Sequence, residues 1–501
     1  MYARRTRPDQ GERMNASTPY RPTVGRDTPG HAPHRRWLHC FALTALLCAT
    51  PPALARASLP LPQHAVIGVE DHHLQAGYWT GKLAHPQRAL LDRAGVAAQN
   101  QRMQQTDRHV HALEALPAEL ARAEVRAWLL PLSAPPTRTL YDAGGREVTK
   151  TQLAAIAANA AVDAVAERAP ARYGLVVHRA DLRTFPSRER VFSSQGDTDI
   201  DRFQESALFP GTPVVIAHTS ADGDWYFVVS PLYAAWIEKQ YVAEGDRAVV
   251  FGYGRGTPSL VVTGATARTV HNPEEAGLSE LQLDMGVRVP LLADWPADTP
   301  VNGQHPYTSH VIQLPVRRAD GALALLPALL PRTADVAPDY LPLTQANLLQ
   351  QSFKFLGERY GWGHSYNTRD CSGFVSEVYR SMGITLPRNT SAQAVSPALE
   401  RVGFEASDSH EKRLAVLRTL QVGDLVYIPG HVMMVIGHDN GTTYTIHDTT
   451  GITYRGADGK TVRTRLNSVA VTPLEPLMFN SEQPTVDRIT AIQRIRAQGA
   501  P

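Results

Sequence analysis

The chain has 501 residues, of which 43% are hydrophobic and 20% are charged, and its formal net charge is +2. This composition excludes a disordered, fibrous or collagen-like chain, and the length predicts three or four domains rather than one core. Residues 1–55 contain eight Arg and three acidic residues, so the rest of the chain has a net charge of about −3 and offers no electrostatic case for binding nucleic acid.

Residues 1–55 are predicted to form a signal peptide. Two arginines at 35–36 precede a mostly apolar stretch at 37–47, and the small residues Ala53 and Ala55 supply a cleavage site. A retained membrane anchor is the alternative, but a histidine interrupts the apolar stretch and two prolines follow it. We therefore expect an exported protein, periplasmic or associated with the cell envelope, with no stable membrane insertion after the leader is removed.

Removal of this leader would leave a single cysteine. Cys40 and Cys48 lie within residues 1–55, so Cys371 would be alone in an exported protein. A single thiol cannot form an internal disulfide, and a zinc site would need its other ligands from His or carboxylate side chains. Cys371 is therefore either a small buried core residue or a reactive thiol.

Residues 56–171 are predicted to form a helical N-terminal region. They are rich in Ala, Leu, Glu, Arg and Gln, and apolar residues recur at helical spacing in 89–97 and in 110–120. From Tyr173 the pattern changes to short apolar runs separated by turns, which marks a domain boundary.

Two small antiparallel β-barrels are predicted next, at 172–246 and 247–340. Their strands are indicated by short runs rich in Val, Ile and aromatic residues. The runs lie at 174–177, 213–217, 225–229, 247–251, 259–262, 286–290 and 311–315. The repetition is one of architecture, since the two segments share no clear sequence repeat.

The last domain is predicted over 341–480 and contains Cys371. A helix over 371–382 has an apolar stripe, with Asp370 as its N-cap and Gly383 just past its end. Cys371 would lie in the first turn, where free backbone N–H groups and the helix dipole stabilise a thiolate. We therefore predict an ionised, reactive sulfur at this helix end.

Three strands are predicted after this helix. They lie at 423–428, 431–437 and 443–449. Because side chains alternate along a strand, His431 and His447 can lie on one face of the sheet. The turn signal at Asp439-Asn-Gly favours a two-residue loop, which would place the two histidines on opposite faces. We therefore predict a loop with an odd number of residues, or a bulge.

Cys371, His431 and His447 then fit a cysteine-peptidase site. Such a site needs a thiolate, an imidazole that stabilises it and later protonates the leaving amine, and a group that orients the imidazole. Backbone N–H groups at the helix start would bind the oxyanion, and water would hydrolyse the thioester. This chemistry requires neither a cofactor nor a metal.

Simpler roles are also open for the histidines. Taken singly, His431 fits a packed residue at a strand edge, and His447 fits the surface of a polar strand. A metal site that adds His438 and Asp448 is disfavoured, because these two have the wrong parity to share a face with the first pair. His364 is either a cleft residue or an ordinary loop histidine.

Five short motifs surround these residues in a fixed order. They are Tyr360-Gly-Trp-Gly, Asp370-Cys-Ser-Gly-Phe, Leu386-Pro-Arg-Asn-Thr-Ser-Ala-Gln, Gly423-Asp-Leu-Val and His431-Val-Met-Met-Val-Ile-Gly. The set resembles the NlpC/P60 family of cell-wall peptidases over roughly 345–475. The resemblance implies a papain-like α+β fold, with Cys371 as nucleophile, His431 as base and His447 as orienting residue.

Weaker likenesses extend upstream. Segments that begin at Arg179, Asp199 and Ser220 resemble the first bacterial SH3 (SH3b) domain of multidomain members, and 284–290 resembles part of a second. Tyr78-Trp79 and the helices after it resemble the N-terminal stabilising segment of the same proteins. The implied order is a stabilising region at 56–171, SH3b domains at 172–246 and 247–340, a catalytic domain at 341–480 and a tail at 481–501.

The resemblance also implies a substrate. Such members cleave the bond between γ-D-glutamate and the diamino acid of peptidoglycan stem peptides or their fragments, and a monomer is expected here. Family analogy suggests oxyanion or substrate contacts from Tyr360, Asp370, Ser372, Asn389 and Thr390. Relatives often carry aspartate where Asn389 stands, and the loss of that charge weakens the attraction for a substrate ammonium group.

Two competing functions are compatible with the sequence. The nearer one is an amidase or a cysteine peptidase of different bond preference. The other is a catalytically silent wall-binding protein, in which Trp225 and Trp236 would line a binding groove rather than pack in a core. The complete triad argues against the silent protein. The first SH3b domain would either bind the wall or close one end of the cleft.

Overall fold

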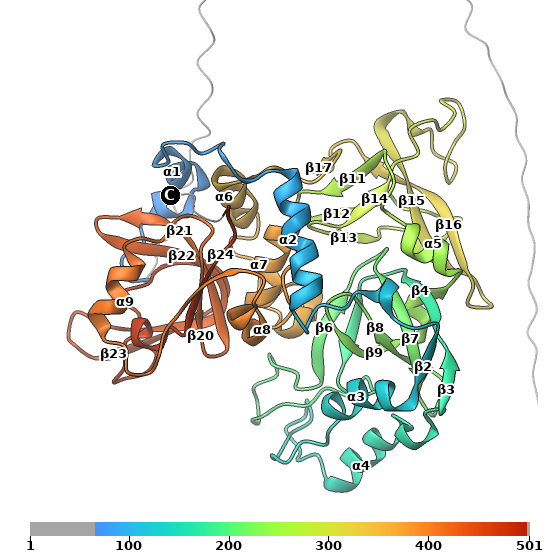
Figure 1. The fold of residues 1–501 in the computed structure, drawn as a ribbon, viewed down its shortest axis with the longest axis horizontal. Coiled ribbons are helices and arrows are strands. Elements are labelled where there is room, and N and C mark those ends of the chain that lie inside the picture. Colours follow the sequence, from blue (N-terminus) through green and yellow to red (C-terminus); the bar gives the residue numbers. More distant parts are fainter. Residues whose placement is uncertain (1–65, 498–501) are drawn as a thin grey trace, which may run out of the picture. The chain divides into compact units, whose positions relative to one another are not determined.

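The computed structural model describes residues 66–497 (Figure 1). The predicted signal peptide, with Cys40 and Cys48, lies outside these residues. Within 66–497, no helix combines the length and the apolar character needed to cross a bilayer.

Short helices dominate the region up to residue 171. The helices are α1 (Ala76–Gly81), α2 (Arg93–Thr106), α3 (Arg122–Leu132) and α4 (Lys150–Ala158), and the strands are β1 (Ala89–Leu91), β2 (Glu119–Ala121) and β3 (Arg168–Pro170). The helical prediction for 110–120 is wrong, because only a 3-10 turn at Leu113–Ala115 and strand β2 form there. The start of the 89–97 prediction is also wrong, since β1 pairs with a strand far away in the chain.

A seven-stranded antiparallel sheet follows, in the order β10-β4-β7-β8-β9-β5-β6. Its strands are β4 (Arg172–Val176), β5 (Ala180–Arg183), β6 (Gln204–Leu208), β7 (Pro213–Thr219), β8 (Trp225–Val229), β9 (Ala234–Glu238) and β10 (Val242–Glu244). Trp225 and Trp236 are buried, and Trp236 Nε1 donates to Ser133 Oγ at 3.1 Å. Both indoles therefore belong to a buried core cluster, and Trp225 also borders a cavity of about 260 Å³.

Residues 247–344 form one helix and several small sheets. The helix is α5 (Arg247–Gly252), and the strands are β11 (Ser259–Val262), β12 (Thr266–Arg268), β13 (Gln282–Asp284), β14 (Arg288–Pro290), β15 (Ser309–Arg317), β16 (Leu323–Pro331), β17 (Val336–Ala337) and β18 (Leu343–Thr344). The strand predicted at 247–251 is wrong. Val250 and Phe251 pack against the seven-stranded sheet as a helix, so tertiary contacts override the β propensity of this run.

The C-terminal part has a six-stranded sheet in the order β19-β24-β20-β21-β22-β23. Its elements are α6 (Gln345–Phe353), α7 (Cys371–Arg380), α8 (Thr390–Val395), β19 (Glu400–Gly403), α9 (His410–Leu417), β20 (Leu425–Ile428), β21 (His431–Asp439), β22 (Thr442–Arg455), β23 (Thr461–Pro473) and β24 (Ala491–Arg494). Residues 481–497 were expected to form a separate tail. Instead β24 pairs with both β19 and β20 inside the sheet.

Helix α7 covers one face of this sheet (Figure 1). Its apolar stripe packs against alternate residues of β21 and β22, such as Met434 and Ile446. The intervening residues of β21, including Met433, face a second core that contains Leu417 of α9. The predicted helix end is confirmed, because Gly383 adopts a φ of +80° just past it.

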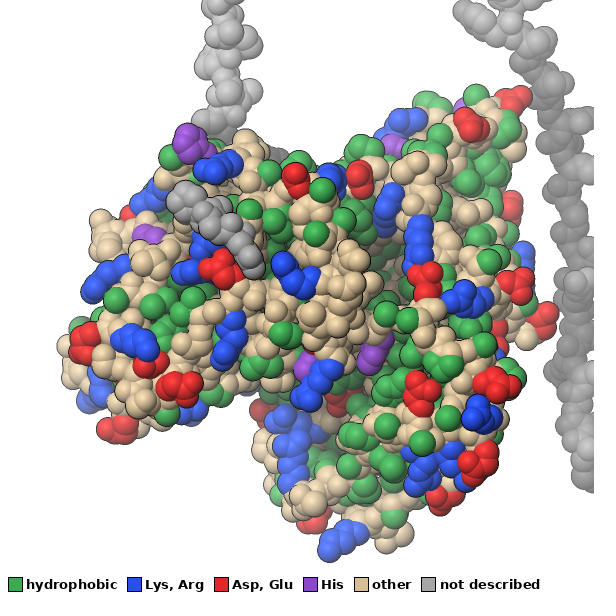
Figure 2. Space-filling model, viewed as in Figure 1, with side chains coloured by type: hydrophobic (Ala, Val, Ile, Leu, Met, Phe, Trp, Pro, Cys, Tyr) green, Lys and Arg blue, Asp and Glu red, His purple; other side chains and the backbone are tan. Residues whose placement is uncertain are grey.

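Charged side chains of both signs are mixed on the face of the molecule drawn in Figure 2. No single-sign field dominates that face. The pattern agrees with the small negative net charge of the chain after residue 55.

Candidate active site

Cys371 is the first residue of α7. Asp370 caps the helix by accepting a backbone N–H of the first turn at 2.8 Å, as predicted. The cysteine is 5% exposed, and its Sγ lies 3.5 Å from Thr390 Oγ1. The backbone N–H of Val432 also donates toward the sulfur. Cys371 therefore lies beside the first residues of β21, where His431 begins the strand.

Asp370 and Ser372 belong to the support beneath this helix end. Arg388 donates to Asp370 Oδ2 at 2.7 Å and to Ser372 Oγ at 2.9 Å. Burial alone would raise the pKa of Asp370, but the charge of Arg388 lowers that pKa to about 2. Neither Asp370 nor Ser372 lines the cavities beside Cys371. Cys371 is also absent from these linings, so the contact of Asp370 and Ser372 with substrate stays a prediction.

A β-bulge sets the orientation of the two histidines. A two-residue turn at 440–441 joins β21 to β22, and both turn residues have positive φ. The pairing shifts at Ile436, which is an extra residue in β21. The predicted bulge is therefore confirmed, and it restores the parity that brings His431 and His447 to one face.

The N-terminal segment packs directly on this bulge. Gly437 has a φ of +143°, and a Cβ there would lie 2.9 Å from Trp79 Cε3. Trp79 is fully buried, and its Nε1 donates to the His73 carbonyl at 2.9 Å. Only glycine combines this backbone conformation with such a close approach.

The two imidazoles form a hydrogen-bonded chain. His431 Nε2 lies 2.7 Å from His447 Nδ1, and His447 Nε2 lies 2.9 Å from Thr472 Oγ1. If each ring carries its proton on Nε2, each donates to the next group in the chain. This arrangement leaves His431 Nδ1 with a free lone pair, as a general base for the thiol requires.

Burial keeps the resting cysteine and histidines neutral. It raises the pKa of the Cys371 thiol to about 12 and lowers the pKa of His431 to about 4. The pKa of His447 is lowered well below its usual value, first by burial and then by His431. Burial therefore opposes the predicted resting thiolate and favours a neutral thiol. The thiolate must form as His431 takes the proton.

Tyr360 lies close to the sulfur and is almost fully buried. Burial raises the pKa of its phenol above the ordinary value, so the phenol stays a hydrogen-bond donor. Asp370 accepts the backbone N–H of Gly373 in the first turn of α7. The backbone N–H groups of Cys371 and Ser372 come before Gly373 and lie at the open N-terminal end of the helix. These donors suit a developing oxyanion beside Cys371.

Two cavities are lined by neighbours of Cys371, although Cys371 itself is not among their lining residues. The first, of about 330 Å³, is lined by Tyr360, Trp362, His431 and His447, and none of its lining residues is Asp, Glu, Lys or Arg. The second, of about 470 Å³, is lined by residues of the N-terminal helical region, the seven-stranded sheet with its loops, and the C-terminal part. Its polar residues include His109, His111, Glu205, Tyr233, Arg388 and Asn389. Thr390, next to Asn389, makes the contact with the sulfur.

Glu205, Tyr233 and Arg388 are among the cavity residues that the sequence reasoning missed. Glu205 accepts hydrogen bonds from Tyr233 and from Thr184, the latter at 2.7 Å. Glu205 lies in the SH3b-like segment that begins at Asp199, and Arg388 lies in the motif that begins at Leu386. Both residues could therefore have been found from the sequence. Tyr233 lies in a segment without such a motif.

His364 does not join the cysteine. Its ring is buried, with Nδ1 2.8 Å from Arg388 and Nε2 3.2 Å from Glu377. Burial, followed by the charge of Arg388, lowers its pKa well below the usual value. His364 is therefore a neutral member of the support beneath α7.

One group among the described residues has metal-ligating side chains close together, namely His72, His73 and Asp439. His73 Nδ1 accepts the backbone N–H of Glu70 at 2.9 Å, so the neutral ring carries its proton on Nε2. That Nε2 faces Asp439 at 3.1 Å, and Lys82 also pairs with Asp439. The arrangement is satisfied as a hydrogen-bonded ion pair and fits a metal poorly.

Comparison with protein families finds two domains in the chain. Residues 357–471 match the NlpC/P60 family, and residues 190–238 match an SH3 domain of the SH3b1 type. A second SH3 match is absent from these results, so that domain stays a prediction.

Several curated relatives share parts of the chain. A γ-D-glutamyl-L-lysine dipeptidyl-peptidase of Bacillus cereus is 29% identical over 265 residues, which are 48% of this chain and 67% of the relative. A probable endopeptidase p60 of Listeria seeligeri is 33% identical over 110 residues, which are 19% of this chain and 18% of the relative.

Solved structures support the fold. An NlpC/P60 endopeptidase from Photobacterium damselae subsp. piscicida superposes with a TM-score of 0.67 at 17% identity, covering 83% of this chain and 96% of that one. This likeness concerns the fold alone.

Proposed function

We propose that the chain, whose residues 357–471 match the NlpC/P60 family, is a cysteine peptidase that hydrolyses γ-D-glutamyl–diamino acid bonds in peptidoglycan stem peptides. The observation that carries the proposal is Cys371 at the start of α7, beside the hydrogen-bonded pair His431 and His447. The name of the Bacillus cereus relative supports the choice of bond, because it specifies a γ-D-glutamyl linkage.

In the proposed mechanism, His431 Nδ1 takes the thiol proton as Sγ attacks the γ-carbonyl carbon. The oxyanion is met by Tyr360 and by N–H groups at the start of α7. His431 then protonates the leaving amine, and a thioester forms on Cys371. Water, activated by the same imidazole, hydrolyses the thioester and restores the thiol. His447 holds the ring of His431 in place through the hydrogen bond between His447 Nδ1 and His431 Nε2.

The mechanism assigns a direction to the cleft. The leaving amine must lie within reach of His431, so the diamino acid would occupy the cavity that contains both histidines. The L-Ala-γ-D-Glu part would then occupy the cavity on the Asn389 side. Asn389 is neutral, but the Glu205 carboxylate in the same cavity supplies a negative charge for a free α-ammonium group.

Export, action as a monomer and the absence of a cofactor complete the proposal. The wall substrate places the activity outside the cytoplasm, which agrees with the predicted leader. The buried Trp225 and Trp236 favour a structural role for the first SH3b domain over wall binding.

The proposal is tested by incubating the protein with L-Ala-γ-D-Glu-diaminopimelate and with its lysine analogue. We expect release of the free diamino acid, which mass spectrometry detects. We also expect kcat/KM to fall by about tenfold or more when the alanine is N-acetylated. Release of ammonia from amidated peptides alone would favour an amidase. Cleavage of none of these peptides by the folded protein would favour the silent wall-binding protein.

A further inference from the structure

The loop that joins Tyr360 to Cys371 has an unusual backbone. Within the segment Trp362–Asn367, three residues other than glycine adopt left-handed φ angles: His364 at +65°, Tyr366 at +61° and Asn367 at +60°. Such angles are unfavourable for residues with a Cβ, so neighbouring groups must stabilise them. The loop connects two residues of the candidate site, and its shape therefore sets their relative position.

Arg179 of the first SH3 region supplies much of this stabilisation. Its guanidinium donates to the His364 carbonyl at 3.0 Å, to Asn367 Oδ1 at 3.1 Å and to the Thr368 carbonyl at 2.6 Å. The Arg179 side chain is 5% exposed, so water competes little for these acceptors. One planar group thus ties both ends of the left-handed segment.

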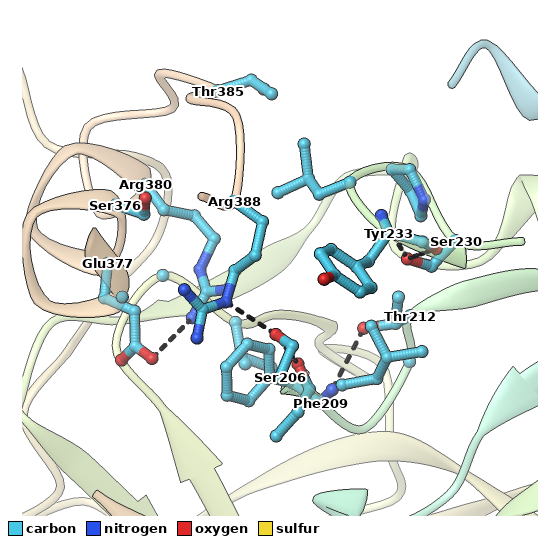
Figure 3. A pocket seen from close by; sticks show the side chains of 18 of the residues that line it. Ser206, Phe209, Thr212, Ser230, Tyr233, Ser376, Glu377, Arg380, Thr385 and Arg388 are labelled. Atoms are coloured by element: carbon cyan, nitrogen blue, oxygen red, sulfur yellow. Dashed lines mark hydrogen bonds and ion pairs between the residues drawn. The ribbon is translucent and has the colours of Figure 1, made fainter. Parts of the chain in front are cut away.

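A second residue of the same region holds the start of the loop. Gln204 Nε2 donates to the Gly363 carbonyl at 2.9 Å, and the Gln204 carbonyl accepts Trp362 Nε1 at 3.1 Å. Next to this contact, Ser206 accepts Arg388 Nε at 2.7 Å, and the two side chains face each other in Figure 3. Arg388 in turn holds Asp370, the N-cap of the nucleophile's helix.

We infer that Arg179 is a positioning residue for the reaction, through which the first SH3 region holds the 361–369 loop in the shape that places Tyr360 and Cys371 on one cleft. The inference rests on the proposed function for its kinetic readout. It gives this region a task in catalysis that is separate from wall binding. It goes beyond ordinary domain contact, because two of the three acceptors are main-chain carbonyls, one within the strained segment and one directly after it.

Replacing Arg179 removes one cation from a buried cluster of charged side chains. Arg179 lies 3.4 Å from Asp284, and Asp284 also pairs with Arg369 at 2.7 Å. Arg369 remains in place when Arg179 is replaced. Arg369 also pairs with Glu358 and Glu377, so a variant at 179 changes both the loop and this cluster, whereas Gln204→Met leaves the cluster in place and changes the loop contact.

The test compares Arg179→Met with Arg179→Lys and with Arg172→Met as the matched control. Arg172 lies on β4 of the same sheet and pairs with Glu244, away from the loop. We expect kcat on L-Ala-γ-D-Glu-diaminopimelate to fall at least tenfold in Arg179→Met with KM changed less than threefold. Arg179→Lys should recover part of the loss, added methylguanidine should raise kcat of Arg179→Met, and Arg172→Met should match the wild type.

A folded Arg179→Met protein with kcat within twofold of the wild type would overturn the inference. So would a loss that neither lysine nor methylguanidine reduces. If Arg179→Met fails to fold, Gln204→Met decides: a fall in kcat at constant KM supports the inference, and unchanged kinetics overturn it. The rate at which iodoacetamide labels Cys371 in the intact protein should also change in Arg179→Met. The label is quantified on the peptide that contains Cys371 after digestion. This labelling separates failure of the inference from failure of the proposed peptidase activity.

Discussion

Replacing Cys371 with alanine should abolish peptide cleavage, with a loss of at least about 10,000-fold in kcat/KM. The reason is that no other thiol lies among residues 66–497, and the proposed mechanism passes through a thioester. The measurement is release of the diamino acid from L-Ala-γ-D-Glu-diaminopimelate. The fold should persist, because the substitution removes only the Sγ atom from a well-packed helix.

Thr390→Val is a useful companion to this variant. It removes the hydroxyl group 3.5 Å from the sulfur and keeps the size of the side chain. A loss of about tenfold or less is expected, since the hydroxyl assists the thiolate but takes no proton from it. Full activity in Cys371→Ala would reject the nucleophile, whatever the behaviour of Thr390→Val.

Replacing His431 with glutamine should reduce kcat by about 1,000-fold, because the amide cannot accept and return a proton. The pH dependence of the wild type gives a finer test. With a pKa of about 4, His431 is already neutral at pH 5.5 and able to act as a base. We expect kcat/KM at pH 5.5 to stay within about twofold of its value at pH 7, whereas a base with the ordinary pKa of 6.5 would lose about tenfold.

The alkaline side of the same profile tests the neutral resting pair. Because burial raises the pKa of Cys371 to about 12, kcat/KM on the N-acetylated peptide, whose α-nitrogen does not titrate, should not fall between pH 8 and 9.5. A fall with an apparent pKa near 8.5 would instead indicate a resting thiolate paired with imidazolium, and would contradict the neutral pair.

Stability must be checked over the acidic range. The pKa values of His431, His447 and His364 are lower in the folded protein than in the unfolded chain, so the unfolded chain binds more protons below pH 6.5. Folding stability is therefore lost as the pH falls from 6.5 toward 4. Circular dichroism at each pH separates this loss from the titration of the active site.

The helix that carries the cysteine could be predicted from sequence because its determinants are local. Asp370, the apolar stripe and Gly383 lie within about four turns of helix, and each acts as expected. The β-bulge could be predicted too. A two-residue Asn-Gly turn alone would place the two histidines on opposite faces of the sheet, whereas the proposed site needs them on the same face. Its position at Ile436 depends on Trp79, which lies far away in the chain and is invisible to a local pattern.

The errors have one physical origin. The run at 247–251 has β propensity but packs as helix α5, and residues 481–497 show no strong strand signal yet supply β24 to the main sheet. In both cases long-range packing decides the structure. The burial that opposes ionisation of Cys371 likewise comes from neighbouring elements and cannot be read from the position of the residue in a helix.

Supporting residues of the site were harder to find than the reacting ones. Cysteine and histidine are rare enough in this region to stand out, whereas Arg388 and Arg179 are two of many arginines. Their importance comes from the acceptors that surround them, Asp370 in one case and the carbonyls of the 361–369 loop in the other.

The most direct test of the account is to trap the covalent intermediate. Wild-type protein and His447→Ala are mixed with L-Ala-γ-D-Glu-diaminopimelate, quenched in acid within milliseconds to seconds, digested and analysed by mass spectrometry. The account predicts an L-Ala-γ-D-Glu group attached as a thioester to the peptide that contains Cys371, absent from Cys371→Ala. Rapid turnover with the acyl group on another residue, or undiminished turnover in Cys371→Ala, would contradict it.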